Sequence, residues 1–313
     1  MGAEPVVELR DVVKVFHGHL GFGRFVAVDG LGFEVRRGEV FGLLGPNGAG
    51  KTTTLKLLLG LLRPDSGSIR VLGALPGEPA SLARIGFLPE QPYFYDYLTG
   101  EEFLDFYGRL HGMSAGERSR RVAETLERVG LRDRARVALR KFSKGMVQRL
   151  GLAQAILHDP ELVILDEPMS GLDPVGRREV RDLILDLRAR GRSVLFSSHI
   201  LQDAEVLCDR VAIAVRGRLR HLGTLDDMLS RAPRWFEVQV AGPVPAEWTG
   251  ERRSAQGELT LIRVPDVEAL GRLLAAVPGG GGRVVSVWPR RESLEDLFLR
   301  EVGVSTEAAG DRR

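Results

Sequence analysis

Cysteine is almost absent from the sequence, since its 313 residues include only Cys208. A lone cysteine excludes an internal disulfide framework and favours a reducing compartment. No window approaches 18 consecutive apolar residues and the chain begins without an apolar leader, so we expect neither a membrane span nor an export signal. An excess of one charge is also missing, because 44 Lys and Arg face 42 Asp and Glu. This balance argues against nucleic acid as a partner.

What is present suits a globular protein of about two domains, at roughly 150 residues per domain. Hydrophobic residues make up 43% of the chain, enough to bury cores without cross-links. Residues 6–10, 12–16 and 26–40 have the β-branched composition of strands. We expect the third of these stretches to break at Gly30 and Gly38.

Three short apolar runs follow, at Val40–Leu44, 162–165 and 193–197. Their length and continuity are typical of strands that are buried on both faces. Helical periodicity appears between them, at residues 101–111 and 118–129. Buried strands that alternate with helices predict an α/β fold in which helices cover a parallel sheet.

The pattern restarts after about residue 232. Strands are expected at residues 235–240, Leu259–Val264 and 284–288, and helices at residues 267–277 and Leu294–Val302. This order predicts a separate, small α+β unit. No catalytic or ligand-binding constellation stands out in it.

Residues 45–52 read GPNGAGKT and match the pattern G-x4-G-K-[ST]. A strand precedes this loop and an apolar helix, residues 53–62, is expected to follow it, which is the context that the pattern needs. The glycines let backbone N–H groups turn towards phosphate oxygens, and the helix N-terminus adds a favourable dipole. Lys51 would reach the terminal phosphates and the Thr52 hydroxyl would bind Mg²⁺. The predicted nucleotide-binding residues here are Gly45, Pro46, Asn47, Gly48, Ala49, Gly50, Lys51, Thr52 and Thr53.

Two carboxylates, Asp166 and Glu167, end the apolar run at 162–165. The carboxyl ends of parallel strands meet at one edge of a sheet, so these side chains should lie near the phosphate loop. Neighbouring residues of a strand point in different directions, which permits two roles. Asp166 suits the coordination sphere of Mg²⁺, and Glu167 suits the polarisation of an attacking water. A plain acidic turn before Pro168 is the alternative.

Together, these pieces resemble the ATP-binding subunit of an ABC transporter, over about residues 5–230. The resemblance implies that Phe16 stacks on adenine and that Gln91, the Q-loop glutamine, contacts Mg²⁺ and water. It implies that residues 170–173, Ser-Gly-Leu-Asp, form the D-loop and that His199 is the switch histidine. Three simpler readings remain open: Phe16 in the core, Gln91 in a solvated turn and His199 as a helix cap.

Residues 142–146 read Phe-Ser-Lys-Gly-Met where the family has its LSGGQ signature. Lys144 replaces the first glycine and Met146 replaces the glutamine, a form familiar among ABC-2 type exporters. The resemblance implies that Ser143 and Gly145 approach the γ-phosphate of ATP on a partner subunit. Ser143 could also be a plain helix N-cap.

The resemblance implies a P-loop NTPase core with an N-terminal antiparallel β subdomain and a helical subdomain, over residues 5–230. Residues 231–303 would form a small C-terminal accessory domain, and residues 304–313 a disordered tail. Because one chain carries one phosphate loop and one signature, a complete site requires two chains. The expected assembly is therefore a homodimer that sandwiches ATP.

The expected activity is ATP hydrolysis with Mg²⁺, carried by Lys51, Glu167 and His199 and coupled to export. The implied partner is a separate membrane permease, which would dock around residues 93–110 and hold the chain at the cytoplasmic face of the membrane. Within that segment, Phe103 and Phe106 are expected in the core. The alternatives are an ABC ATPase that acts on ribosomes or DNA and a regulatory nucleotide-binding module with little turnover. Nothing in this chain indicates the transported substrate.

Overall fold

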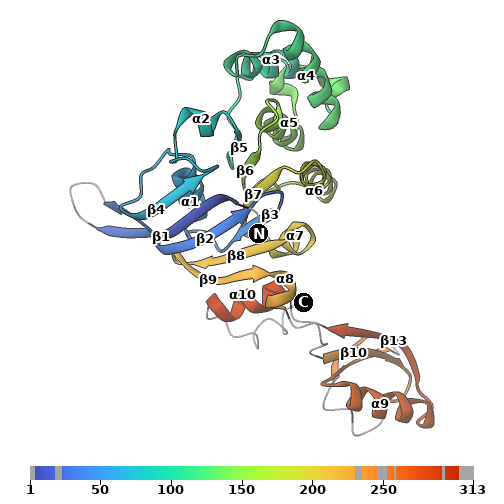
Figure 1. Cartoon of the computed structure of the whole chain (residues 1–313). Coiled ribbons are helices and arrows are strands. Elements are labelled where there is room, and N and C mark those ends of the chain that lie inside the picture. Colours follow the sequence, from blue (N-terminus) through green and yellow to red (C-terminus); the bar gives the residue numbers. More distant parts are fainter. Residues whose placement is uncertain are drawn as a thin grey trace. The chain divides into compact units, whose positions relative to one another are not determined.

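The computed structural model describes residues 4–17, 23–229, 235–244, 248, 252–256, 259–290 and 293–302. The chain divides into two compact units, residues 1–225 and 226–313 (Figure 1). The phosphate loop and both carboxylates lie in the first unit. The expected tail at 304–313 lies outside the described residues.

The first unit begins with a three-stranded antiparallel sheet, in the order β2 (Arg24–Arg36), β1 (Pro5–His17), β4 (Ser66–Val71). The expected break at Gly30 is wrong, because β2 continues through it. Gly30 adopts φ +66, and the pairing with β1 shifts register nearby. Glycine tolerates this left-handed conformation, so the strand bends without ending.

A six-stranded sheet forms the centre of the unit, as the buried apolar runs predicted. In spatial order its strands are β5 (Ile85–Leu88), β6 (Leu162–Asp166), β7 (Ser193–Ser198), β3 (Val40–Leu44), β8 (Arg210–Val215) and β9 (Arg218–Thr224). The first five are parallel, and β9 runs antiparallel to β8. The carboxyl ends of β6, β7 and β3 therefore meet at one edge.

Helix α1 (Lys51–Leu58) follows the loop after β3; it begins two residues and ends four residues earlier than expected. Its apolar face packs into a core that also takes side chains from both sheets, among them Phe33 and Phe41, whose rings stack with centroids 5.1 Å apart. Each such fully buried side chain contributes about 1.5–3 kcal/mol. This core holds the phosphate loop against the sheet edge.

The helical part of the first unit lies between β5 and β6 in the chain (Figure 1). Its elements are α3 (Gly100–Leu110), α4 (Ala115–Arg128), η2 (Arg132–Arg134), η3 (Leu139–Lys141) and α5 (Lys144–Ile156). Thr99 and Glu102 form a capping box at the start of α3. Ser143 caps α5 by accepting a hydrogen bond from the Met146 N–H at 3.3 Å, so the N-cap prediction is confirmed.

The remaining helices of the first unit flank the central sheet. They are α2 (Pro79–Leu82), before β5; α6 (Pro174–Ala189), between β6 and β7; and α7 (Leu201–Leu207), between β7 and β8. Asp173 caps α6 and Pro174 occupies its first turn, a common arrangement at a helix start. No helix in the described part of the chain is both long and apolar enough to cross a membrane.

The second unit is α+β, as predicted. Its antiparallel sheet has the order β11 (Arg252–Gln256), β12 (Leu259–Val264), β10 (Trp235–Ala241), β13 (Arg283–Arg290), and its longer helices are α9 (Val267–Gly279) and α10 (Leu294–Val302). Strand β11 was not expected. The core of this unit is formed by side chains of the sheet and α9, among them Val238, Ile262 and Leu273.

Candidate nucleotide-binding site

The phosphate loop links the end of β3 to the start of α1, and its backbone demands glycine at two positions. Gly45 has φ +159 and Gly50 has φ +93. A β-carbon on Gly45 would lie 2.3 Å from the Ala214 carbonyl oxygen, and one on Gly50 would lie 2.2 Å from that of Ala27. Any side chain there would push the loop off its neighbours.

The loop borders a cavity of about 520 Å³. Its lining residues are Pro46, Asn47, Gly48, Ala49, Gly50, Lys51, Thr52, Thr53, Glu90, Glu167, Ser170 and His199. Residues that are far apart in the sequence therefore converge on the phosphate loop. All but Glu90 and Ser170 are residues that we predicted for the site.

The Lys51 ammonium is almost completely enclosed, with 7% of the residue exposed. It donates to the carbonyl oxygen of Gly45 at 2.7 Å and approaches that of Pro46 at 3.3 Å. It also lies 3.1 Å from Glu167 Oε1. An ammonium has three N–H bonds, so these three oxygens occupy all of its donors.

Glu167 joins Lys51 to the predicted switch histidine. Its second oxygen, Oε2, lies 2.8 Å from His199 Nδ1. Because a carboxylate oxygen accepts this hydrogen bond, Nδ1 is the ring nitrogen that carries the hydrogen. The Glu167 backbone sits in the left-handed region, at φ +48. Such a conformation costs about 1–3 kcal/mol in a non-glycine residue and is concentrated at functional sites.

Asp166 points to a different set of partners. Its Oδ1 accepts hydrogen bonds from Ser197 Oγ at 2.6 Å and from Thr52 Oγ1 at 3.3 Å. The expectation that Asp166 and Glu167 diverge therefore holds. The Thr52 hydroxyl and the Asp166 carboxylate bring two oxygen donors together, and Mg²⁺ prefers oxygen ligands.

Comparison with known proteins bears directly on this arrangement. The family described as ABC transporter matches residues 28–170. An uncharacterized ABC transporter ATP-binding protein of Synechocystis is 42% identical, over 96% of this chain and 86% of that protein. The chain belongs to the ABC transporter ATP-binding family. It is an ATP-binding subunit and an ATPase.

Other relatives of this ABC ATPase are named for export or resistance. The chain is 45% identical to the fluoroquinolones export ATP-binding protein of Mycobacterium tuberculosis H37Rv, with 88% of each chain covered. It is 41% identical to the linearmycin resistance protein LnrL of Bacillus subtilis, over 90% of this chain and 95% of that protein. A solved ATP-binding subunit of an ABC transporter superimposes with a TM-score of 0.63 at 35% identity, covering 71% of this chain and 91% of that one.

Six predicted site residues of the ABC ATPase do not line this cavity: Phe16, Gly45, Gln91, Ser143, Gly145 and Asp166. Two of them, Gly45 and Asp166, contact residues that do line it, Lys51 and Thr52. Gln91 is exposed, and the preceding Glu90 lines the cavity in its place. Phe16 is 38% exposed and lies under Lys14, whose Nζ is 5.8 Å from the ring centroid. Ser143 and Gly145 stand at the start of α5. Their roles stay predictions.

Sequence reasoning missed Glu90, Ser170 and Ser197. Ser197 pairs with Asp166 across the parallel strands β6 and β7. A partial signal existed, because both strands were predicted in the buried parallel sheet and each ends in a polar residue. Ser170 had been placed in the D-loop without a role at the cavity. No sequence signal separates Glu90 from Gln91, since both are polar and precede Pro92.

Proposed function

We propose that this ATPase drives export through a separate membrane permease, by closing with a second copy of itself around two ATP molecules. The observation that carries the proposal is the Glu167 carboxylate, held between Lys51 Nζ and His199 Nδ1 at the edge of the phosphate loop. The names of the fluoroquinolone and linearmycin relatives support export. The permease would hold the chain at the inner face of the membrane.

The residues in and around the cavity have different roles in ATP binding and hydrolysis. Lys51 and the backbone N–H groups of residues 47–53 bind the phosphates. Thr52 and Asp166 hold Mg²⁺, with Gln91 as a further predicted ligand; when bound, the ion neutralises charge on the phosphate oxygens. Glu167 accepts a hydrogen bond from the attacking water and orients it.

The site is completed by a second chain. Ser143 and Gly145 lie outside the cavity that Lys51 and Glu167 border, although the resemblance assigns all four to ATP. The Ser143 hydroxyl and the start of α5 form a surface that suits an anion. We therefore assign them to the nucleotide of the partner copy.

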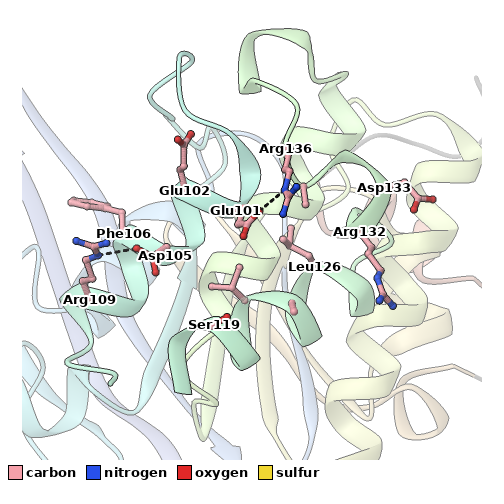
Figure 2. Close-up of a pocket in the computed structure, with 13 residues that line it drawn as sticks. Glu101, Glu102, Asp105, Phe106, Arg109, Ser119, Leu126, Arg132, Asp133 and Arg136 are labelled. Atoms are coloured by element: carbon pink, nitrogen blue, oxygen red, sulfur yellow. Dashed lines mark hydrogen bonds and ion pairs between the residues drawn. The ribbon is translucent and has the colours of Figure 1, made fainter. Parts of the chain in front are cut away.

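The permease would dock on the helical part of the unit. A cavity of about 790 Å³ lies against α3 and α4, with Phe106, Val122 and Leu126 among its apolar lining (Figure 2). Charges of both signs border it, including the ion pair of Glu101 and Arg136 at 3.4 Å. An apolar recess with a charged rim suits an amphipathic helix of a partner.

Phe106 was expected in the core, which is wrong: it is 41% exposed, whereas Phe103 is buried as expected. Phe103 packs on Phe94 inside the unit, with ring centroids 4.5 Å apart, whereas Phe106 is among the residues that line the cavity. Tyr93 is 91% exposed in the same docking segment. Exposed aromatic side chains are enriched at interfaces.

The dimer is tested by substituting Glu167→Gln and measuring molecular mass by size-exclusion chromatography with light scattering. We expect a dimer with ATP and Mg²⁺ and a monomer without nucleotide, because binding is kept and hydrolysis is lost. Lys51→Ala is the control and should remain monomeric in ATP. A monomeric Glu167→Gln variant in saturating ATP contradicts the composite site.

The permease is tested by co-expression with the membrane protein encoded beside this gene. We expect the two to copurify, and Phe106→Ala to weaken the complex. Phe25→Ala is a matched control, because Phe25 is also exposed but lies on β2. Copurification with ribosomes in place of the membrane protein contradicts the proposal.

A further inference from the structure

Lys144, the first residue of α5, reaches across to the loop that follows Glu167. A β-carbon placed on Gly171 would lie 1.9 Å from Lys144 Nζ, 3.1 Å from Cε and 3.8 Å from Cδ. The end of the lysine side chain therefore occupies the space that a side chain at position 171 would fill. Gly171 adopts φ +66, so the turn itself also favours glycine.

A second contact lies one helical turn further along α5. Gln148 Nε2 donates a hydrogen bond of 2.9 Å to the Pro168 carbonyl oxygen, and this side chain is buried. Residues four apart share one face of a helix. The face that carries Lys144 and Gln148 therefore touches the loop at both of its ends, Pro168 and Gly171.

The loop between these contacts is tied to Glu167. The Ser170 N–H donates to the Glu167 carbonyl oxygen at 3.1 Å, and the Leu172 N–H approaches the Met169 carbonyl oxygen at 3.4 Å. A movement of residues 168–172 would therefore reach the strained backbone of Glu167. Its carboxylate contacts Lys51 and His199, so small displacements matter for hydrolysis.

The stability of α5 does not explain why a lysine occupies its first position, residue 144. A cation at the first position of a helix opposes the helix dipole, and α5 has no acidic residue in its first turn to offset it. In the described part of the chain, no carboxylate forms an ion pair with Lys144. Its close neighbour is the backbone of Gly171.

We propose that Lys144 is a positioning residue for ATP hydrolysis, which holds the turn at Gly171 against α5 and thereby sets the backbone that carries Glu167. This inference rests on the proposed dimer, in which the start of α5 meets the ATP of one site and Glu167 acts at the other. Lys144 and Gln148 then form a mechanical link between the two sites. Closure of α5 on one ATP is transmitted to the glutamate of the other.

Steady-state ATPase kinetics of the full chain test this link. We expect Lys144→Met to lower kcat about 5- to 10-fold with KM changed by less than about twofold, because the nucleotide contacts remain. Lys144→Arg, which keeps length and charge, should retain at least about half of kcat. Lys141→Met is the matched control, an exposed lysine three residues earlier, and should leave both constants unchanged.

A double-substitution cycle tests the contact itself. Gly171→Ala should lower kcat through backbone strain at φ +66 and by displacing the Lys144 ammonium from the turn. In the Lys144→Gly background only the backbone strain remains, so adding Gly171→Ala should cost less than it does in the wild type. Additive effects contradict the contact.

Three further results would overturn the proposal. A raised KM with unchanged kcat in Lys144→Met indicates direct contact with nucleotide, and wild-type kinetics indicate no role. Equal losses of kcat in Lys144→Arg and Lys144→Met would show that the cation has no positioning role. The dimer is scored separately, because Glu167→Gln combined with Lys144→Met should still dimerise in ATP. Loss of the dimer in Glu167→Gln alone counts against the proposed function.

Discussion

Ser197 at the end of β7 donates a hydrogen bond of 2.6 Å to Asp166 at the end of β6. The same hydroxyl oxygen accepts the backbone N–H of Glu167 at 2.9 Å. One buried hydroxyl thus holds both members of the acidic pair, and its single proton is committed to Asp166. Asp166 and Glu167 are oriented by the neighbouring strand as well as by their own.

We therefore expect Ser197→Ala to reduce kcat by about tenfold, because the Asp166 carboxylate and the Glu167 backbone both lose a partner. The buried N–H left unpaired also costs about 1–3 kcal/mol of folding stability. ATPase kinetics and urea denaturation measure the two effects.

Ser193→Ala is the matched control for this substitution. Ser193 is buried at the other end of β7 and accepts a hydrogen bond from the Gly38 N–H. It should lose comparable stability at unchanged kcat. Equal losses of activity in both variants would show that destabilisation, and not the orientation of the acids, limits turnover.

Acidification should destabilise the first unit through His158. Burial, with the stacked ring of His111 3.9 Å away as a second cause, lowers the pKa of His158 to about 4. The unfolded chain therefore binds a proton near pH 6.5 that the folded chain takes up only near pH 4. Stability contributed by the neutral ring is complete above about pH 6.5 and falls by about 2–3 kcal/mol towards pH 4.

Urea denaturation at several pH values measures this slope. His158→Phe keeps a ring against His111 and cannot be protonated, so its stability should vary less between pH 6.5 and 4. The other groups that face His158 are Asp159, Arg121 and the Ile85 carbonyl oxygen, which its Nε2 meets at 3.1 Å. His17→Gln, at an exposed position, should retain the wild-type slope. An unchanged slope in His158→Phe contradicts the assignment.

Glu161 should affect folding stability at a lower pH than His158 does. Hydrogen bonds from Arg84 and Arg37 lower its pKa to about 2. Its stabilising effect is present above pH 4.5 and is lost as the pH falls towards 2. Because the pair is partly solvated, we expect Glu161→Gln to remove only about 1 kcal/mol at pH 7. The difference from wild type should vanish near pH 2, as measured by thermal unfolding.

Cys208 should be unreactive in the native protein. Burial raises the pKa of its thiol, and the thiolate is the reactive form. Its Sγ would lie 2.7 Å from a β-carbon on Gly42, in the middle of β3. We expect a thiol reagent to label Cys208 only in denaturant, and Gly42→Ala to cost about 1–3 kcal/mol through overpacking. Gly112→Ala is a control for added methyl volume, because no atom lies within 4 Å of its β-carbon. Because Gly112 has a left-handed backbone, Gly112→Ala should cost only conformational strain and no overpacking.

Much of the fold follows from local patterns. Apolar runs of five or so residues predicted the buried parallel strands because neither face of such a strand meets water. Phe106 shows the limit of this reasoning. Helical periodicity placed it on the same stripe as Phe103, yet Phe106 is 41% exposed and Phe103 is buried, because only tertiary packing decides which aromatic residue is enclosed.

The residues of the candidate site also fall into two groups, those that a local sequence pattern indicates and those that only the tertiary structure reveals. Residues 45–52 and the pair Asp166–Glu167 could be read from the sequence because each is a short local pattern with its own chemistry. The contacts of Ser197 with Asp166 and of Lys144 with Gly171 could not. They join residues about 30 apart, and they depend on which strands are neighbours and on how α5 packs. The sequence alone determined that this chain binds ATP, and the tertiary structure decided how the acids that act on it are held in place.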